Sequence, residues 1–275
     1  MKKFKILLLV FLSLTLFSGC IQVNTKINLN NDGSGTLEET FLMKSSFVKM
    51  IKDFALSFDS TKKDEFKMFN EDELKDKASS YGEGVTYKSG EKFSSEDYEG
   101  YKVTYAFSDI NKLKVDLSPK DKVPLGEEVE NKDNKSEEGT LNFKFTKGDP
   151  STLVIVLPNS ETQKEDTSTF IEDSSATQDS AMSSEQLQYV MNMFDGMKLS
   201  LELTFKDKIK ETDASYVNGS DVTLMQIDFS ELIKNKQVIE DLNKSKPESL
   251  EKFKEIIGDI PGIKLETKEK ITIKF

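Results

Sequence analysis

The chain has 275 residues and a formal net charge of −11, because 49 aspartates and glutamates outnumber 38 basic residues, all of which are lysine. An acidic chain is repelled by phosphate backbones, so we expect no nucleic-acid partner. Without histidine or arginine the chain cannot build a Ser-His-Asp or Cys-His triad, a histidine metal site or a guanidinium clamp, so the composition predicts a non-enzymatic protein with no catalytic residues, no metal and no cofactor.

The first 19 residues have the pattern of an export signal. Three lysines precede an apolar run at residues 6–17, and a Ser-Gly pair follows it. A retained transmembrane helix is the alternative, but the run is shorter than the roughly 20 apolar residues that span a bilayer. Residues 1–19 are therefore predicted to be a cleaved signal peptide.

Cys20 is the only cysteine, so it has no disulfide partner within the chain. The sequence LFSGC at residues 16–20 resembles the lipobox of bacterial lipoproteins, although Phe17 stands where an aliphatic residue is usual. The resemblance implies that Cys20 is lipidated with a diacylglycerol group and becomes the new N-terminus. Stable anchoring takes more than one acyl chain. We therefore expect the acylated Cys20 to hold the protein on the exported side of a cell membrane or outer membrane.

Residues 21–43 alternate as a β-hairpin with one buried face, on either side of a glycine-rich stretch. The apolar residues of one parity are Ile21, Val23, Ile27 and Leu29 before that stretch and Leu37, Phe41 and Met43 after it, with Thr25 among the first four. An amphipathic helix follows, with Ser45 or Ser46 as its cap. Its apolar positions are Phe47, Met50, Ile51, Phe54, Ala55 and Phe58.

The stretch between the two strands, NNDGSGTLEETF at residues 30–41, partly matches a calcium-binding EF-hand loop. The matching positions are Asp32, Ser34, Gly35 and Leu37. However, Asn30 and Phe41 stand where an aspartate and a bidentate glutamate are required, and the flanks alternate as strands. We interpret the stretch as a tight turn, because Asp-Gly and Ser-Gly suit hairpin loops.

The rest of the chain alternates between strand patterns, helix patterns and polar segments. Strands are predicted near residues 85–93, 101–107, 140–145 and 152–157, after a helix near 71–80. Two segments, 118–139 and 159–184, are poor in apolar residues and are predicted to be mobile or disordered. Helix and strand patterns return beyond them: a helix at 187–194, a strand at 197–205, a hairpin turning at Asn218-Gly219, helices near 230–242 and 247–258, and a final strand pair at 262–275.

Segregated strands and helices predict an α+β fold, an antiparallel sheet with packed amphipathic helices. We divide the chain into the signal peptide 1–19, an N-terminal α+β region 20–158, a disordered linker or insertion 159–184, and a C-terminal α+β region 185–275. The start of the mature chain, IQVNTKINLNNDGSGTLEETF, looks like that of a group of uncharacterised bacterial lipoproteins, the LppM-like proteins. The later run MKLSLELTFKDKIKETDASYVNGSDVTLMQIDFSELI is similar to their second half. This resemblance implies an α+β envelope domain in which an apolar cleft could accept an acyl chain, and it transfers no catalytic residues.

Three functions are compatible with these patterns. We expect a membrane-anchored lipoprotein that serves as a non-enzymatic binding or structural module of the cell envelope, with an envelope protein as a partner. The alternative is a carrier or sensor of a hydrophobic acyl-chain ligand held against the helices at 47–58 and 187–194, which requires an apolar cavity. A carboxylate-based hydrolase is the third, and it requires two acidic side chains in one cleft about 5–9.5 Å apart. The sequence names no ligand-binding residues.

Overall fold

The computed structural model describes residues 21–58, 68–117, 139–158, 196–245 and 250–275. The predicted signal peptide, Cys20, most of the charged segment at 118–139, the polar segment at 159–184 and the helix at 187–194 lie outside these residues. In the described part of the chain, no helix is both long and apolar enough to span a bilayer.

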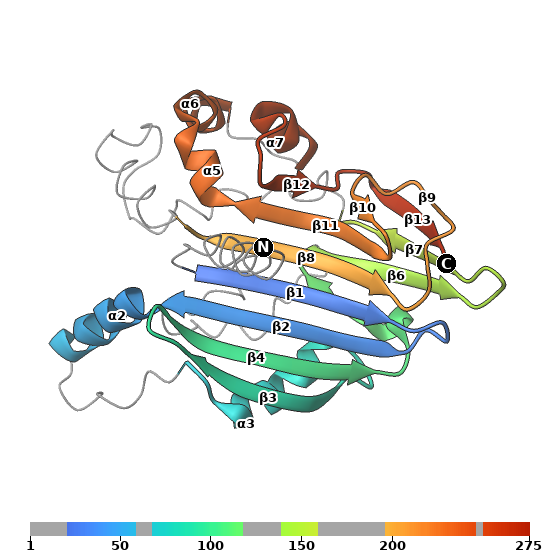
Figure 1. The fold of residues 1–275 in the computed structure, drawn as a ribbon, viewed down its shortest axis with the longest axis horizontal. Coiled ribbons are helices and arrows are strands. Elements are labelled where there is room, and N and C mark those ends of the chain that lie inside the picture. Colours follow the sequence, from blue (N-terminus) through green and yellow to red (C-terminus); the bar gives the residue numbers. More distant parts are fainter. Residues whose placement is uncertain (1–20, 59–67, 118–138, 159–195, 246–249) are drawn as a thin grey trace, which may run out of the picture.

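A large sheet forms the body of the molecule (Figure 1). Its strands are, in order, β10 (Val217–Asn218), β11 (Asp221–Asp228), β8 (Lys198–Phe205), β1 (Ile21–Leu29), β2 (Gly35–Lys44), β4 (Tyr98–Phe107) and β3 (Thr86–Ser94), and β12 (Ile263–Leu265) also pairs with β11. β1 and β8 run parallel, whereas all the other pairs of this sheet are antiparallel. The α+β class is confirmed, but the expectation of a purely antiparallel sheet is wrong.

A smaller sheet packs against one half of the large one. Its strands are β5 (Val115–Asp116), β6 (Thr140–Thr146), β7 (Thr152–Val156), β13 (Lys270–Lys274) and β9 (Glu211–Thr212). Both sheets contain strands from the N-terminal region 20–158 and the C-terminal region 185–275, so the two regions are interleaved.

The predicted final strand pair is wrong, because β12 joins the large sheet and β13 joins the small one. Glu266, directly after β12, is buried and accepts hydrogen bonds from the Ser215 N–H at 2.6 Å and from the Ser215 hydroxyl at 3.0 Å. Its own N–H donates to the carbonyl of Leu224. Between the two strands, Glu266 is thus bonded to Ser215 and Leu224, and the predicted pairing of the strands with each other does not form.

Helices surround the two sheets (Figure 1). They are α2 (Ser45–Phe58), α3 (Glu71–Lys77), the 3₁₀ turns η1 (Ala78–Tyr81) and η2 (Ile110–Lys112), α5 (Phe229–Lys234), α6 (Lys236–Ser245) and α7 (Leu250–Ile257). Asn70 caps α3, since its side chain accepts a hydrogen bond from the Asp72 N–H and donates one to Glu73. Helices occur at the predicted positions within the described residues, but the one predicted near 230–242 is divided at Asn235 into α5 and α6. The Ser45 hydroxyl has no hydrogen-bond partner among the described residues, so the expectation that Ser45 caps α2 is wrong. The hairpin at Asn218-Gly219 is confirmed.

The apolar face of the large sheet is covered in two different ways. Towards the end of β1, Ile27 and Leu29 belong to a cluster that includes residues of both sheets, so the two sheets pack face to face there. Towards the start of β1, Ile21 and Val23 belong to a second cluster, which packs against Val48 of α2. A third cluster joins α5, α6, α7 and β12. The same alternating strands thus pass from a two-sheet core to a helix-covered one.

Candidate functional site

The predicted turn between β1 and β2 is confirmed. Gly33 has a φ of 87°, and its N–H donates to the Asn30 carbonyl. The Asp32 carboxylate accepts hydrogen bonds from the N–H of Ser34 at 3.0 Å and from the Ser34 hydroxyl at 2.6 Å. These bonds lower the pKa of Asp32, chiefly through the hydroxyl. Asp32 therefore builds the turn, and no cluster of three or more acidic or cysteine side chains suited to a metal occurs among the described residues.

A polar pair interrupts the apolar face in the middle of the large sheet. Thr25 of β1 and Glu39 of β2 are direct partners in the strand register, and both are buried. In the same row of the sheet, Thr25 pairs with Leu201 of β8 and Glu39 pairs with Val103 of β4. The Thr25 hydroxyl, among the residues that the structure describes, has no hydrogen-bond partner. This pair marks the boundary between the two-sheet core and the helix-covered core.

Glu39 is 4% exposed and is held by donors from three elements. The ammonium of Lys77, at the end of α3, lies 2.8 Å from its Oε1. The Tyr81 hydroxyl of η1 donates to Oε2 at 2.6 Å, and the Tyr101 hydroxyl of β4 donates to Oε1 at 3.1 Å. A buried carboxylate requires such compensation for its lost hydration. The network therefore fastens the α3–η1 segment onto the face of the sheet.

The tyrosines around Glu39 are held in their protonated form. Burial, and then the negative charge of Glu39, raises the pKa of Tyr81 and of Tyr101 far above the usual value. Burial also raises the pKa of Tyr105, whose hydroxyl donates to the carbonyl of Leu74 at 3.0 Å. All three hydroxyls are thus donors at neutral pH, and none is poised to act as a base.

Glu39 was assigned no role in the sequence analysis. The signal is nevertheless present, because Glu39 has the same strand parity as Leu37 and Phe41. Alternation predicts that this side chain points into the core. The missing information was the source of its donors, since Lys77 and Tyr81 lie about 40 residues further along the chain.

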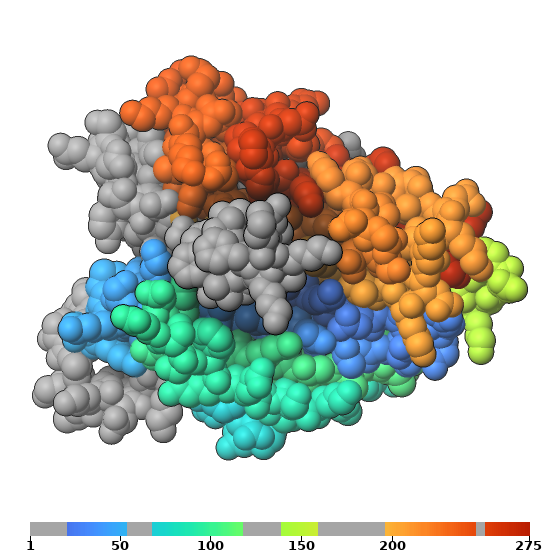
Figure 2. Space-filling model, viewed as in Figure 1, coloured from blue at the N-terminus to red at the C-terminus, as the bar shows by residue number. Residues whose placement is uncertain are grey.

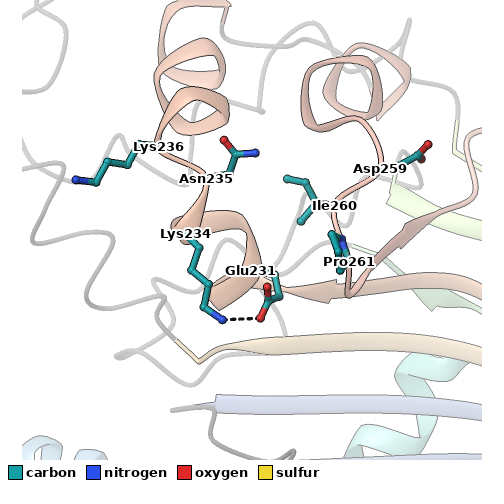
Figure 3. A pocket seen from close by; sticks show the side chains of 7 residues that line it. All are labelled: Glu231, Lys234, Asn235, Lys236, Asp259, Ile260 and Pro261. Atoms are coloured by element: carbon teal, nitrogen blue, oxygen red, sulfur yellow. Dashed lines mark hydrogen bonds and ion pairs between the residues drawn. The ribbon is translucent and has the colours of Figure 1, made fainter.

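One surface depression, of about 560 Å³, lies between α5, α6 and the segment that precedes β12 (Figure 3). Glu231 and Asp259 both line it, so it brings two carboxylates to one place. In Figure 3 the Asp259 side chain points away from Glu231. Glu231 pairs with Lys234 at 2.7 Å and Asp259 with Lys254 at 3.2 Å, and the Asp259 side chain is fully exposed. The depression therefore lacks the buried acid that a carboxylate hydrolase needs to hold a proton near neutral pH.

A second depression, of about 710 Å³, lies beside η1. Its lining is Ser79, Ser80, Gly82, Glu83, Gly84, Val85, Lys112 and Lys114. Glu83 and Lys112 form an ion pair at 2.9 Å, and the hydrogen bond to Glu83 raises the pKa of Lys112. Val85 is the one large apolar side chain among these residues, beside serines, glycines and charged side chains. This depression is not the apolar cavity that an acyl-chain carrier requires.

The large sheet begins directly after the predicted anchor, Cys20, which itself lies outside the described residues. β1 begins at Ile21, the residue covalently bonded to Cys20, and Ile21 is buried in the helix-covered core. Ile21 pairs with Met43 of β2. Acyl groups on Cys20 would therefore attach directly to a central strand of the large sheet.

Comparison with known proteins adds one structural likeness. No protein-family model matches the chain, and no curated protein does. Among solved structures, the chain is similar to the folded domain of Mycobacterium tuberculosis LppM, determined by NMR, with a TM-score of 0.29 and 11% sequence identity. The match covers 77% of this chain and 84% of the LppM domain. LppM names the group that the sequence resembles, but a TM-score this low carries no argument about fold or function.

Proposed function

We propose that the protein is a membrane-anchored bacterial lipoprotein whose folded body is a non-enzymatic binding or structural module of the cell envelope. The observation that carries the proposal is the junction at residues 20 and 21. A lipobox-like cysteine directly precedes a buried central strand, with no linker between the anchor and the fold. A body attached in this way is held against the bilayer surface.

The chemistry of the described side chains supports a binding or structural role. The most deeply buried carboxylate on the apolar face of the large sheet, Glu39, is engaged by Lys77 and two tyrosines. In each of the two depressions a lining carboxylate is paired with a lining lysine, Glu231 with Lys234 in one and Glu83 with Lys112 in the other. Binding through the surface, to an envelope protein or the membrane itself, fits this arrangement better than chemistry in a buried site.

Substitution of Cys20 in the full chain tests the anchor. The wild-type N-terminal peptide should begin at Cys20 and carry acyl groups by mass spectrometry, and the protein should enter the detergent phase on phase separation. Cys20→Ala should lose the acyl mass. Ser18→Ala, which keeps a small residue before the cysteine, is the control and should be processed normally. If Cys20→Ala entered the detergent phase as fully as the wild type does, the proposed anchor would be wrong.

Native mass spectrometry of the released body addresses the second part of the proposal. A body with no bound small molecule supports a structural or partner-binding module. A stoichiometric acyl-containing ligand would contradict it and favour a carrier.

A further inference from the structure

Helix α2 lies next to the position of the predicted anchor. The antiparallel register pairs Ile21, the residue covalently bonded to Cys20, with Met43, and Lys44 follows Met43 at the end of β2. α2 begins at the following residue, Ser45. Neighbouring strands are about 4.8 Å apart and each residue advances about 3.3 Å along a strand, so the start of α2 lies within roughly 10 Å of Ile21. Figure 1 shows α2 extending from the end of the sheet at which β1 begins.

The apolar surface of α2 is wider than the surface that the sheet covers. Val48 is fully buried in the helix-covered core, and Phe47 and Ile51 are half-buried against it. Met50 is 55% exposed. At 100° per residue, Val48 and Met50 bound an apolar arc of about 160°. The Val48 side of this arc packs against the sheet, and the Met50 side faces outward. Part of the blue surface of α2 is visible at one end of the molecule in Figure 2.

The charge of α2 is opposite to that of the chain. The helix contains Lys49, Lys52 and one acid, Asp53, and Lys44 directly precedes it. Lys52 forms an ion pair with Glu99 of β4 at 3.6 Å. The segment is therefore basic within a chain of net charge −11. A basic, amphipathic helix with an exposed apolar edge suits the interface of a bilayer that contains anionic lipids.

The exposed large apolar side chains are unevenly distributed. In the described ranges they are Met50, Phe93 and Val217, at 55%, 42% and 42% exposure. Phe93 pairs with Gly100, which pairs with Leu42, in the row of the sheet adjacent to the start of β1. Val217 lies towards the opposite end, in the row of Leu203. Met50 thus lies at the end of the sheet where β1 begins. Phe93 lies at the same end, but its row belongs to the face of the sheet opposite to α2, and Val217 supplies a matched control at the other end.

We propose that α2 is a second membrane contact, with Met50 in the boundary between the lipid headgroups and the acyl chains of the bilayer that holds Cys20. This inference rests on the proposed anchor for its orientation. The acyl group fixes the distance to the bilayer, and α2 fixes which side of the body faces it. The exposed edge of α2 therefore contacts the surface of the lipid bilayer.

The test uses the full acylated chain in vesicles of phosphatidylethanolamine and phosphatidylglycerol that contain a trace of a phospholipid with a photoreactive diazirine at the top of its acyl chain. After illumination and proteolysis, mass spectrometry reads two things in one digest: the acyl mass on the peptide that begins at Cys20, and lipid adducts on every other peptide. We expect several-fold more adduct on the α2 peptide with Met50 than on the peptide with Val217. Met50→Glu should lower the α2 adduct several-fold, whereas Val217→Glu should leave it unchanged.

The two readings separate the two proposals. An acylated Cys20 with equal adduct levels on the Met50 and Val217 peptides would overturn the α2 contact and leave the anchor intact. A non-acylated Cys20 would overturn the anchor, and the ratio of the two adducts on the same vesicles would still decide the α2 contact. An α2 adduct that persists undiminished in Met50→Glu would also overturn it.

Discussion

The two ends of the large sheet have the same alternating strands but different covers. At the end far from Cys20, Leu29 and Phe205 lie under the second sheet, and Phe205 packs against Phe275 with ring centroids 4.6 Å apart. At the near end, Ile21 and Met43 lie under α2, whose outer edge is exposed at Met50. The far end is closed on itself, and the near end offers an apolar edge where we place the membrane. Alternation in sequence therefore shows that a face is buried but not by what.

The largest expected loss of stability is at the end of the large sheet that lies far from Cys20. Phe205→Ala removes a buried ring from the two-sheet core, and such truncations lower the free energy of unfolding by about 4 kcal/mol. Urea unfolding followed by circular dichroism measures the change. A loss below about 1 kcal/mol would contradict tight packing of the two sheets.

The next effect lies at the boundary between the two cores. Glu39→Ala leaves Lys77, Tyr81 and Tyr101 without their shared acceptor, and breaking a buried pair on one side costs about 3 kcal/mol. Glu39→Gln keeps one acceptor oxygen and should cost less, so it is the matched control. Equal stability of the Ala variant and the wild type in urea unfolding would show that the network does not fasten α3–η1 to the sheet.

A smaller effect is expected at the near end. Val48→Ala removes two buried methyl groups from the contact between α2 and the sheet and should cost about 2 kcal/mol. Met50→Ala, on the same helix but exposed, should change stability by less than about 0.5 kcal/mol. Hydrogen exchange of the α2 amides should accelerate in the first variant alone. Acceleration in both, or in neither, would contradict the orientation of the helix.

The smallest expected effect is the pH dependence of stability that arises from the tyrosines around Glu39, because this dependence is absent at neutral pH. The pKa values of Tyr81, Tyr101 and Tyr105 are raised in the folded protein, so their contribution to stability is complete below about pH 10, the pKa of tyrosine in the unfolded chain. It declines as the pH rises above 10, because deprotonation then favours unfolding. In a titration followed by tyrosine absorbance, these three rings should ionise only together with loss of structure. Their ionisation at pH 10 in a folded protein would contradict the network.

The sequence predicted the local structure well, since local structure follows from local patterns. The turn at Gly33 follows from Asp-Gly chemistry, and α2 follows from its helical period. The parallel pairing of β1 with β8 could not be predicted, because these strands are separated by more than 160 residues of chain and nothing in either strand names its partner. The placement of β12 and β13 in different sheets was equally hidden, since the buried Glu266 between them bonds to Ser215, about 50 residues earlier in the chain.

The candidate site was predictable to the same extent. The sequence locates Cys20 and the strand that follows it, and the structure places that strand in the interior of the large sheet. Glu39 could have been recognised by its parity, but its donors come from α3, η1 and β4 and were visible only in three dimensions. The exposed edge of α2 could not be predicted either, because the same apolar period would be found in a helix whose apolar side chains are all buried.

The central position of β1 has a mechanical consequence. A pulling force on lipid-bound Cys20 would enter the molecule along the axis of a strand that is paired over its whole length with β2 on one side and over nearly all of it with β8 on the other. In that direction the ladder hydrogen bonds are loaded in shear, so many must rupture together, whereas an anchor on an edge strand could be peeled off one bond at a time. The proposed attachment point is therefore among the most tear-resistant places on this sheet.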